Sequence, residues 1–329
     1  MTKNDFFSYL NSKINVKKLD DWSNFPPLSW FKKVFVQRMI NYDFPQHIFL
    51  ESTSVCNFNC RICARITGKT LIGSMDFDFF KKIVNEAANY GPRNFSLHLS
   101  GEPLINPRLM EMAKYIKEKN RRNSISLTTN GSLLSPTIAE QIVRIGIDKV
   151  SISFLSPEAQ TYREKTGVDK LDEVEKNVKE LIKIKGRAAK PKIFVRMIVD
   201  DDTQSQAKNF ISKWQNEKVI IELRDQHNYG GNVAKSHVRK NHKRYPCYHL
   251  WFSPAVHFNG DVSICCDDLA RVGVLGNASD QTVNKIWNSE LIKKYRQLHL
   301  QGKYDQISIC AKCDVWNMYA DIFFFWQKK

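Results

Sequence analysis

The sequence lacks the features of an exported or membrane-embedded protein. Its first residues, MTKNDFFSYLNSK, contain no basic start followed by an apolar run and a small-residue cleavage site, so no secretory signal is visible. The longest apolar patch, IFFFW near the C-terminus, is far shorter than the roughly 20 residues that span a bilayer. We therefore expect a cytoplasmic protein that does not enter a membrane.

Acidic residues are few beside the basic ones. The 329 residues include 50 Lys and Arg but 34 Asp and Glu, which gives a formal net charge of +16. This surplus suggests an anionic partner, although scattered surface lysines would give the same charge. One run, AKSHVRKNHKRYP, contains basic residues and no acid: Lys235, Arg239, Lys240, Lys243 and Arg244. The run lacks interleaved aromatic residues that could stack on bases, so a nucleic acid is a disfavoured partner.

Eight cysteines in a chain without an export signal are not expected to form disulfides, because the cytosol keeps thiols reduced. Metal binding or redox chemistry is the leading interpretation. The stretch CNFNCRIC contains Cys56, Cys60 and Cys63, with no His or fourth Cys nearby. Structural zinc normally takes four ligands in two pairs, so it fits this triplet poorly. An iron-sulfur cluster held by three thiolates, with one iron open for a reactant, fits better.

Short β-rich runs alternate with amphipathic helical runs from His47 to about Asn228. Six strands are predicted, at 47–52, 95–100, 124–130, 149–154, 192–199 and 219–225. The helical runs at 76–91 and 171–186 have apolar residues every three or four positions and end at a glycine. This alternation predicts an α/β fold, a partial (β/α)6 barrel with right-handed crossovers. In such folds the chemistry gathers at the carboxyl ends of the strands, and the cysteine triplet directly follows the first strand.

The chain changes character after HNYGGN, and we expect five segments. They are a helical N-terminal extension (1–46), the barrel (47–228), a basic connector (229–246), a small cysteine-bearing domain (247–315) and a helical tail (316–329). The fourth segment begins with two short predicted strands around a turn at Asn259 and Gly260. The tail is expected to dock on the body, with a partner interface as the alternative.

An apolar residue, Ile62, precedes the third Cys of the triplet, and SGEP, TTNG and SISF follow at the second, third and fourth predicted strands. Together with the cysteine triplet, these motifs resemble the radical S-adenosylmethionine (radical SAM) superfamily. The resemblance covers residues 47 to about 315. It implies a 4Fe-4S cluster on Cys56, Cys60 and Cys63 whose open iron binds S-adenosyl-L-methionine. In that family an electron, from a donor such as flavodoxin or ferredoxin, splits the sulfonium to a 5′-deoxyadenosyl radical that takes a substrate hydrogen.

The resemblance also implies which residues hold S-adenosylmethionine. Gly101 and Glu102 would hold the methionyl amine, and Ser153 would reach the ribose or carboxylate. Arg196 could pair with a carboxylate or could be an outward-facing strand residue. The motif positions supply the other cofactor-binding candidates: Ile62, Ser100, Thr129 and Asn130. Leu155 stands where many relatives have Asp, which puts a polar contact from that position in doubt.

The remaining cysteines resemble the first part of the SPASM domain, which carries auxiliary iron-sulfur clusters. No cysteine follows the C-x2-C pair, so the resemblance implies one auxiliary 4Fe-4S cluster in a twitch-like arrangement. Its ligands would be Cys247, Cys265, Cys310 and Cys313. Zinc on the same four thiolates is the alternative. A fully ligated cluster cannot bind substrate through iron, so we expect it to transfer electrons.

Cys266 is left over from this set. It is a buried small side chain beside a ligand, the ligand in place of its neighbour, or a thiol that returns a hydrogen atom to a substrate radical.

Dehydrogenation is the reaction that the resemblance favours. The cysteine spacing of the second domain resembles that of 2-deoxy-scyllo-inosamine dehydrogenase-like members of the superfamily. This implies a substrate radical, next to a hydroxyl, that loses a proton to a base and an electron to the auxiliary cluster. The expected substrate is a sugar, an aminocyclitol or a related metabolite, free, phosphorylated or nucleotide-linked. Candidate bases or substrate contacts end the sixth predicted strand: Arg224, Asp225, His227 and Tyr229.

Three other functions stay open. The first is epimerisation of a sugar or peptide with Cys266 as hydrogen donor. The second is modification of a ribosomally made peptide. The third, from a different class, is a non-catalytic iron-sulfur or zinc protein that binds nucleic acid through the basic run.

Overall fold

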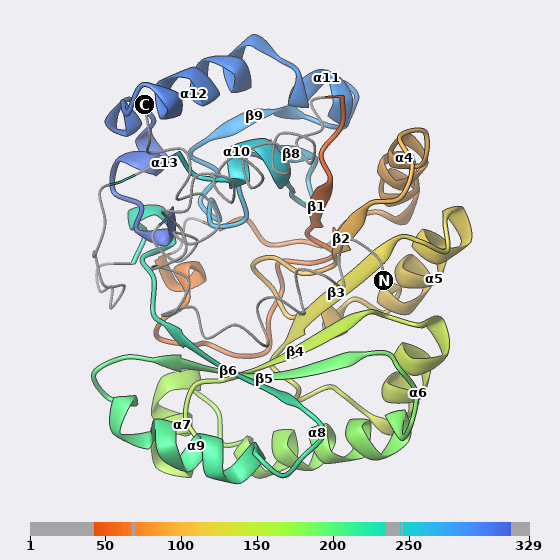
Figure 1. Ribbon diagram of the computed structural model, residues 1–329, viewed down its shortest axis with the longest axis vertical. Helices are drawn as coiled ribbons and strands as arrows, with labels where there is room; N and C mark the ends of the chain where they lie inside the picture. The colour runs from red at the N-terminus through yellow and green to blue at the C-terminus, as the bar shows by residue number, and fades with distance from the viewer. Residues whose placement is uncertain (1–42, 68–69, 234–243, 245, 317–329) are drawn as a thin grey trace, which may run out of the picture.

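The computed structural model describes residues 43–67, 70–233, 244 and 246–316 (Figure 1). The expected N-terminal extension up to residue 42, the tail beyond Trp316 and most of the basic run lie outside the described residues. None of the described helices is long and apolar enough to cross a membrane.

Six parallel strands, neighbouring in chain order, form the larger part of the sheet. They are β1 (His47–Leu50), β2 (Asn94–Ser96), β3 (Ser124–Thr129), β4 (Lys149–Phe154), β5 (Lys192–Val199) and β6 (Ile220–Asp225). The whole sheet has nine strands in the order β6-β5-β4-β3-β2-β1-β7-β8-β9, and its ends do not meet. The predicted fold class, an open α/β barrel of six βα units, is confirmed.

Helices cover the outer face of this curved sheet (Figure 1). They are α4 (Phe77–Ala88), α5 (Leu109–Lys119), α6 (Pro136–Ile145), α7 (Ala159–Thr166), α8 (Leu171–Lys185) and α9 (Ala207–Trp214). Local signals set their ends: the Asp76 side chain accepts from the Phe79 amide at the start of α4, and Gly186 ends α8 as predicted. The α4 helix ends at Ala88, three residues before the predicted Gly91.

The two faces of the parallel strands differ in chemistry. On β4, Val150, Ile152 and Phe154 are buried in the apolar core beneath the helices. The alternate residues Lys149, Ser151 and Ser153 point to the inner, concave face because side chains alternate along a strand. The inner face of the barrel is therefore polar.

The C-terminal region extends the same sheet. Its strands are β7 (Ala255–Val256), which pairs in parallel with β1, then the antiparallel β8 (Asp261–Ser263) and β9 (Val274–Asn277). Its helices are α10 (His249–Phe252), α11 (Val283–Trp287), α12 (Glu290–Leu300) and α13 (Ser308–Ala311). The two strands predicted around Asn259 and Gly260 are present as β7 and β8, and Gly260 has a φ of 92° in the turn. The five-segment division stays a prediction.

Short 3-10 helices complete the described chain. They are η2 (Ala64–Thr67), η3 (Pro103–Ile105), η4 (Gln204–Gln206), η5 (Tyr229–Gly231) and η6 (Tyr304–Gln306). Three of them matter for the site, because η2 follows the cysteine triplet, η3 follows SGEP and η5 follows β6.

Candidate functional site: two cysteine centres joined by a polar inner face

The loop between β1 and η2 carries Cys56, Cys60 and Cys63 at the carboxyl end of β1, as predicted. The end of α7 holds this loop through its backbone: the Asn59 amide donates to Thr166 O (3.1 Å) and the Arg61 amide to Lys165 O (2.9 Å). Ile62 is half-buried between the second and third cysteines. Burial raises the pKa of Cys60 to about 12, and burial also raises those of the other two thiols. Bound cations are therefore needed to hold these groups as thiolates.

Gly101 allows the SGEP loop to approach the cysteine loop closely. A Cβ at this position would lie 2.4 Å from Thr53 O and 2.6 Å from Val55 O. The next amide, that of Glu102, donates to Val55 O at 2.9 Å. Only glycine therefore fits here without a shift of the backbone that leads into Cys56.

The Glu102 carboxylate is buried, and its two oxygens bind the loops around it. Thr129 Oγ1 donates to Oε1 (2.7 Å), the Asn130 amide donates to Oε2 (2.7 Å), and the Leu104 amide caps η3 on Oε1 (3.1 Å). Burial raises the pKa of Glu102, whereas these hydrogen bonds lower it. The effect of burial is larger, so the pKa is about 6. The structure thus brings together three predicted cofactor residues, Glu102, Thr129 and Asn130.

Asn57 connects the cysteine loop with the TTNG loop, and the sequence reasoning missed it. Its Nδ2 donates to Ser132 Oγ at 2.9 Å, and its Oδ1 accepts from Asn130 Nδ2 at 2.8 Å. Asn130 Oδ1 in turn accepts from the Ser132 amide (3.0 Å). No local pattern marks an Asn after a Cys as special, so no sequence signal could have found it.

Ser100 binds a second residue that the sequence reasoning missed, Glu51 at the end of β1. The Ser100 hydroxyl donates to the buried Glu51 carboxylate. Glu51 also lies 3.1 Å from His257 Nδ1 and 3.4 Å from Arg271 Nη2, both from the C-terminal region. Burial would raise the pKa of Glu51, but these partners lower it. An acid within the strand HIFLES was the available signal, since buried acids need partners.

On the inner face of the barrel, the half-buried cations Lys149, Arg196 and Arg224 lie around one carboxylate, that of Glu222. Arg196 lies beside Ser153 in register, and its Nε donates to Glu222 Oε2 at 2.8 Å. Arg224 donates through Nη2 to Glu222 Oε1 at 2.6 Å. Arg196 therefore faces inward, and the outward-facing alternative is wrong. Burial would raise the pKa of Glu222, but the two guanidinium groups lower it.

Lys149 adds the third cation to this face. Its Nζ lies 3.9 Å from the centroid of the Phe194 ring, and no carboxylate pairs with it among the described residues. Burial, assisted by Arg196, lowers the pKa of Lys149 to about 8. Burial also lowers the pKa of the neighbouring His98 to about 3, so that ring is neutral.

The segment after β6 reaches from the barrel to the C-terminal region. His227 Nε2 lies 3.0 Å from Asp267 Oδ1, and the His227 and Tyr229 rings lie 4.1 Å apart. Tyr229 has a φ of 47°, which is rare outside glycine and is frequent at functional sites. Asp225 is exposed at the end of β6, on the face of the strand opposite Glu222 and Arg224, so the structure does not bring it to the inner-face residues.

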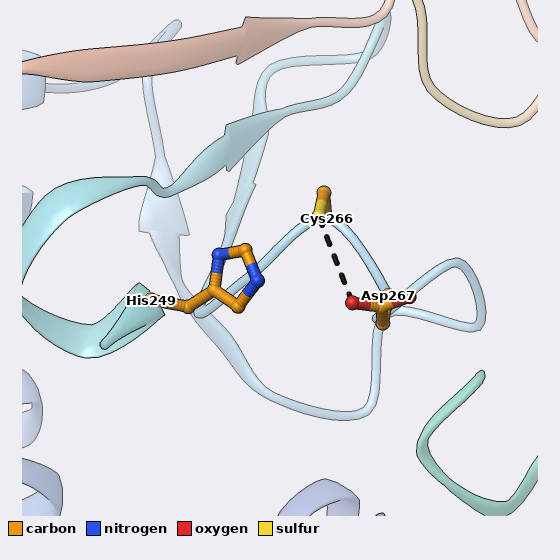
Figure 2. Close-up of side chains that lie close together, drawn as sticks. All are labelled: His249, Cys266 and Asp267. Carbon is orange, nitrogen blue, oxygen red and sulfur yellow. Dashed lines mark hydrogen bonds between the residues drawn. The ribbon is translucent and has the colours of Figure 1, made fainter. Parts of the chain in front are cut away.

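A second cysteine centre is an enclosed, largely apolar cavity. Four thiols line it, those of Cys247, Cys265, Cys310 and Cys313. Further wall residues include Arg244, His249, Asp267 and His299. Cys266 is absent from the described lining, and its thiol instead donates to Asp267 Oδ2 at 3.6 Å (Figure 2). The lining of the cavity therefore favours Cys265 over Cys266 as the fourth thiol ligand of this centre.

The ligand chemistry of the two centres is that of soft thiolates, which suit an iron-sulfur cluster; four thiolates suit zinc as well. Beside the second centre, the ligand atoms of His249, Cys266 and Asp267 lie within 4.8 Å of one another (Figure 2). His249 and Asp267 belong to the wall of the same cavity, so their group with Cys266 is not a separate centre.

An open barrel with three cysteines at its mouth, beside a cavity walled by four more, defines a two-centre iron-sulfur protein. Family comparisons agree: the Radical SAM superfamily model matches residues 50–212, and the SPASM model, an iron-sulfur cluster-binding domain, matches residues 247–314. The chain belongs to the radical SAM superfamily and is an enzyme. Its cofactors are S-adenosyl-L-methionine and 4Fe-4S clusters, as the resemblance implied.

Individual relatives share the fold and part of the sequence. "Probable GTP 3',8-cyclase" of Sulfurisphaera tokodaii is 32% identical over 163 residues, 49% of this chain and 49% of the relative. BtrN, crystallised with AdoMet and 2-DOIA, matches with a TM-score of 0.59 and 19% identity over 82% of this chain and 93% of BtrN. Streptococcus suis SuiB, bound to precursor peptide SuiA, matches with a TM-score of 0.67 and 13% identity over 93% of this chain and 83% of SuiB. The chain spans about half the length of the curated relatives it matches.

Proposed function

We propose that this enzyme dehydrogenates a sugar, an aminocyclitol or a related polar metabolite. The observation that carries the proposal is the enclosed cavity with four cysteines, because a fully ligated cluster has no site for substrate and is suited to electron transfer. The fold similarity to BtrN, whose structure holds 2-DOIA, supports the substrate class.

When bound, S-adenosylmethionine and its cluster supply the radical that removes a substrate hydrogen, and the auxiliary cluster supplies an electron acceptor. The chain's own residues would orient these groups. Cys56, Cys60 and Cys63 would hold the first cluster, and the loop network of Gly101, Glu102 and the residues around Asn130 would fix the position of the methionyl group. Ser153 on the inner face would reach the ribose or carboxylate of S-adenosylmethionine.

His227 is the proposed proton acceptor. Its Nε2 lies 3.0 Å from Asp267 Oδ1, so a carboxylate stands ready to stabilise the imidazolium that forms when the ring takes a proton. Burial would raise the pKa of Asp267, but His227 lowers it and keeps it ionised. The proposed base would then lie at the junction of the barrel with the auxiliary cavity, since Asp267 lines that cavity.

The inner face favours a substrate with an anionic group, such as a phosphate. Lys149, Arg196 and Arg224 face one carboxylate, Glu222, among the described residues of that face. A half-buried ammonium such as that of Lys149, which pairs with no carboxylate among the described residues, is costly unless an anion joins it. Arg196 could serve the carboxylate of S-adenosylmethionine, whereas Lys149 begins β4 at the end of the barrel away from the cysteine loop.

Epimerisation with Cys266 as hydrogen donor is the second candidate. A hydrogen-atom donor must be a protonated thiol, and burial, together with Asp267, raises the pKa of Cys266 well above its usual value. Peptide modification stays a further alternative, since SuiB of similar fold binds a peptide. The basic run that could bind nucleic acid lies, except for Arg244, outside the described residues.

Product analysis tests the reaction. The anaerobically reconstituted enzyme is incubated with S-adenosylmethionine, a reductant or a reduced flavodoxin, and a panel of sugar phosphates and aminocyclitols in heavy water. Dehydrogenation is expected to give a product two hydrogens lighter, without solvent deuterium at the reacting carbon. A product of unchanged hydrogen count that contains one deuterium identifies an epimerase instead. We expect the enzyme to act in the cytoplasm, where thiols stay reduced.

A further inference from the structure

His299, in the last turn of α12, is a buried residue whose tautomer is fixed by one hydrogen bond. Its side chain is 0% exposed. The backbone N–H of Cys247 donates to His299 Nδ1 at 3.2 Å. A backbone N–H can only donate, so Nδ1 accepts and carries no proton. The ring is therefore neutral, and its single proton is on Nε2.

The Nε2–H group of His299 has no hydrogen-bond acceptor among the described residues. A buried donor left without an acceptor destabilises the folded protein, so such groups are rare unless something else accepts from them. The ring lies on the wall of the auxiliary cavity together with Cys247, Cys265, Cys310 and Cys313. The group that fills this cavity is then the available acceptor.

We propose that His299 Nε2–H donates a hydrogen bond to a sulfur atom of the auxiliary cluster and thereby raises its reduction potential. Sulfide and thiolate sulfurs carry negative charge that increases on reduction, so a donor stabilises the reduced state more than the oxidised one. Arg244 acts in the same direction from the wall of the same cavity, where its Nη2 donates to Cys310 O at 2.6 Å. The inference depends on the four-cysteine centre alone and holds for a dehydrogenase and an epimerase equally.

Substitution of His299 by each of two amide side chains tests the acceptor position, Nδ1, and the donor position, Nε2, separately. In His299→Asn, the side-chain oxygen can still accept from the Cys247 amide, but no donor remains at the Nε2 position. In His299→Gln, the amide nitrogen takes the Nε2 position and restores the donor. The midpoint potential of the auxiliary cluster is measured by EPR-monitored redox titration, in chains whose Cys56, Cys60 and Cys63 are all alanine so that one cluster gives the signal. We expect a lower potential in His299→Asn and a smaller shift in His299→Gln.

Tyr304→Phe is the matched control. The Tyr304 ring packs edge-on against His299 with centroids 5.0 Å apart, but its hydroxyl donates to Arg244 O and Tyr304 is absent from the described cavity lining. This variant is expected to keep the wild-type potential. An unchanged potential in His299→Asn, or an equal fall in both amide variants, would overturn the proposal.

An iron count shows whether the variants have lost their cluster. If they have, the hydrogen bond can still be tested in protein that keeps His299. Protein with 15N-labelled histidine is reduced and examined by pulsed EPR. A weak 15N coupling transmitted through the N–H···S bond is expected. Absence of any histidine coupling to the reduced auxiliary cluster would exclude the hydrogen bond.

Discussion

The side-chain amide of Asn130 donates to Oδ1 of Asn57 at 2.8 Å and so joins the loop after β3 to the cysteine loop after β1. The two residues are 73 positions apart in the sequence. Their contact, together with the Glu102 carboxylate on the Asn130 amide, makes one connected framework of three loops at the barrel mouth. The geometry of the S-adenosylmethionine site is expected to depend on this framework.

Asn57→Ala removes two side-chain hydrogen bonds from the cysteine loop. Each is worth about 0.5–1.5 kcal/mol, so we expect the KM for S-adenosylmethionine to rise about 2- to 10-fold and the Tm to fall by a few degrees. Uncoupled cleavage of S-adenosylmethionine under reductant measures this. Asn59→Ala in the same loop is the control, because the bond of Asn59 to Thr166 comes from its backbone. Equal effects of the two variants would contradict the role given to Asn57.

Gly101→Ala is expected to lower stability and to reduce the iron bound at the first cluster. The added Cβ meets backbone oxygens at 2.4 and 2.6 Å, and backbone cannot rotate away as a side chain can. We expect a loss of about 2–4 kcal/mol, as for other severe steric changes in a packed site. Gly146→Ala is the control: with a φ of 75° and nothing within 4 Å, it should cost about 1 kcal/mol of backbone strain and leave the iron content intact.

The raised pKa of Glu102 leads us to expect that the stability of the folded protein depends on pH. Its pKa of about 6 lies above the ordinary value of 4.5, mainly because burial disfavours the ionised form. A raised pKa means that the folded state binds the proton more tightly, so this contribution is complete below pH 4.5 and is lost as the pH rises through 6. The loss amounts to about 2 kcal/mol. The Tm of wild type minus that of Glu102→Gln should fall between pH 4.5 and 7, and a flat difference would contradict the raised pKa.

Separate substitution of Cys265 and Cys266 shows which of the two adjacent cysteines is a ligand of the auxiliary cluster. Cys265→Ala should lose the auxiliary cluster and reduce the iron content from about eight to about four per chain. Cys266→Ala should keep both clusters, since Cys266 is absent from the described lining of the cavity. Full turnover in Cys266→Ala supports dehydrogenation, whereas turnover lost with all iron retained supports the epimerase. Loss of iron in Cys266→Ala instead of Cys265→Ala would reverse the assignment.

Lys149→Met should weaken anion binding on the inner face. The ammonium is replaced by an apolar chain of similar length, and we expect the stabilisation of the enzyme by inorganic phosphate or pyrophosphate in thermal unfolding to correspond to about tenfold weaker binding. Lys192→Met is the control, because Lys192 pairs with Lys149 in register but is exposed. The affinity for S-adenosylmethionine should stay unchanged. Equal anion binding by wild type and Lys149→Met would contradict the proposed substrate class.

Local sequence predicted the regular elements well. The predicted strands 149–154 and 192–199 coincide with β4 and β5 residue for residue, because β-branched residues with a two-residue alternation define them without help from the rest of the chain. The placement of the cysteine triplet, SGEP and TTNG at consecutive strand ends followed from the same alternation.

Contacts between distant segments could not be predicted in this way. The Glu51 contact with His257 spans 206 positions, and the parallel pairing of β7 with β1 joins the C-terminal region to the first strand. Nothing within either segment encodes its partner. The inward direction of Arg196, too, depends on the curvature of the whole sheet and not on the sequence of β5.

The sequence by itself determined the class of chemistry, because three closely spaced cysteines and the C-x2-C pair bring thiolates into the range that iron-sulfur clusters need. The tertiary structure decided which of two adjacent cysteines faces the second centre and which histidines lie beside it. Cys265 and Cys266 cannot be distinguished from the sequence, but only Cys265 belongs to the described lining of the cavity. Likewise, His299 gains its role from the Cys247 amide, 52 positions away, since that contact fixes which ring nitrogen holds the proton.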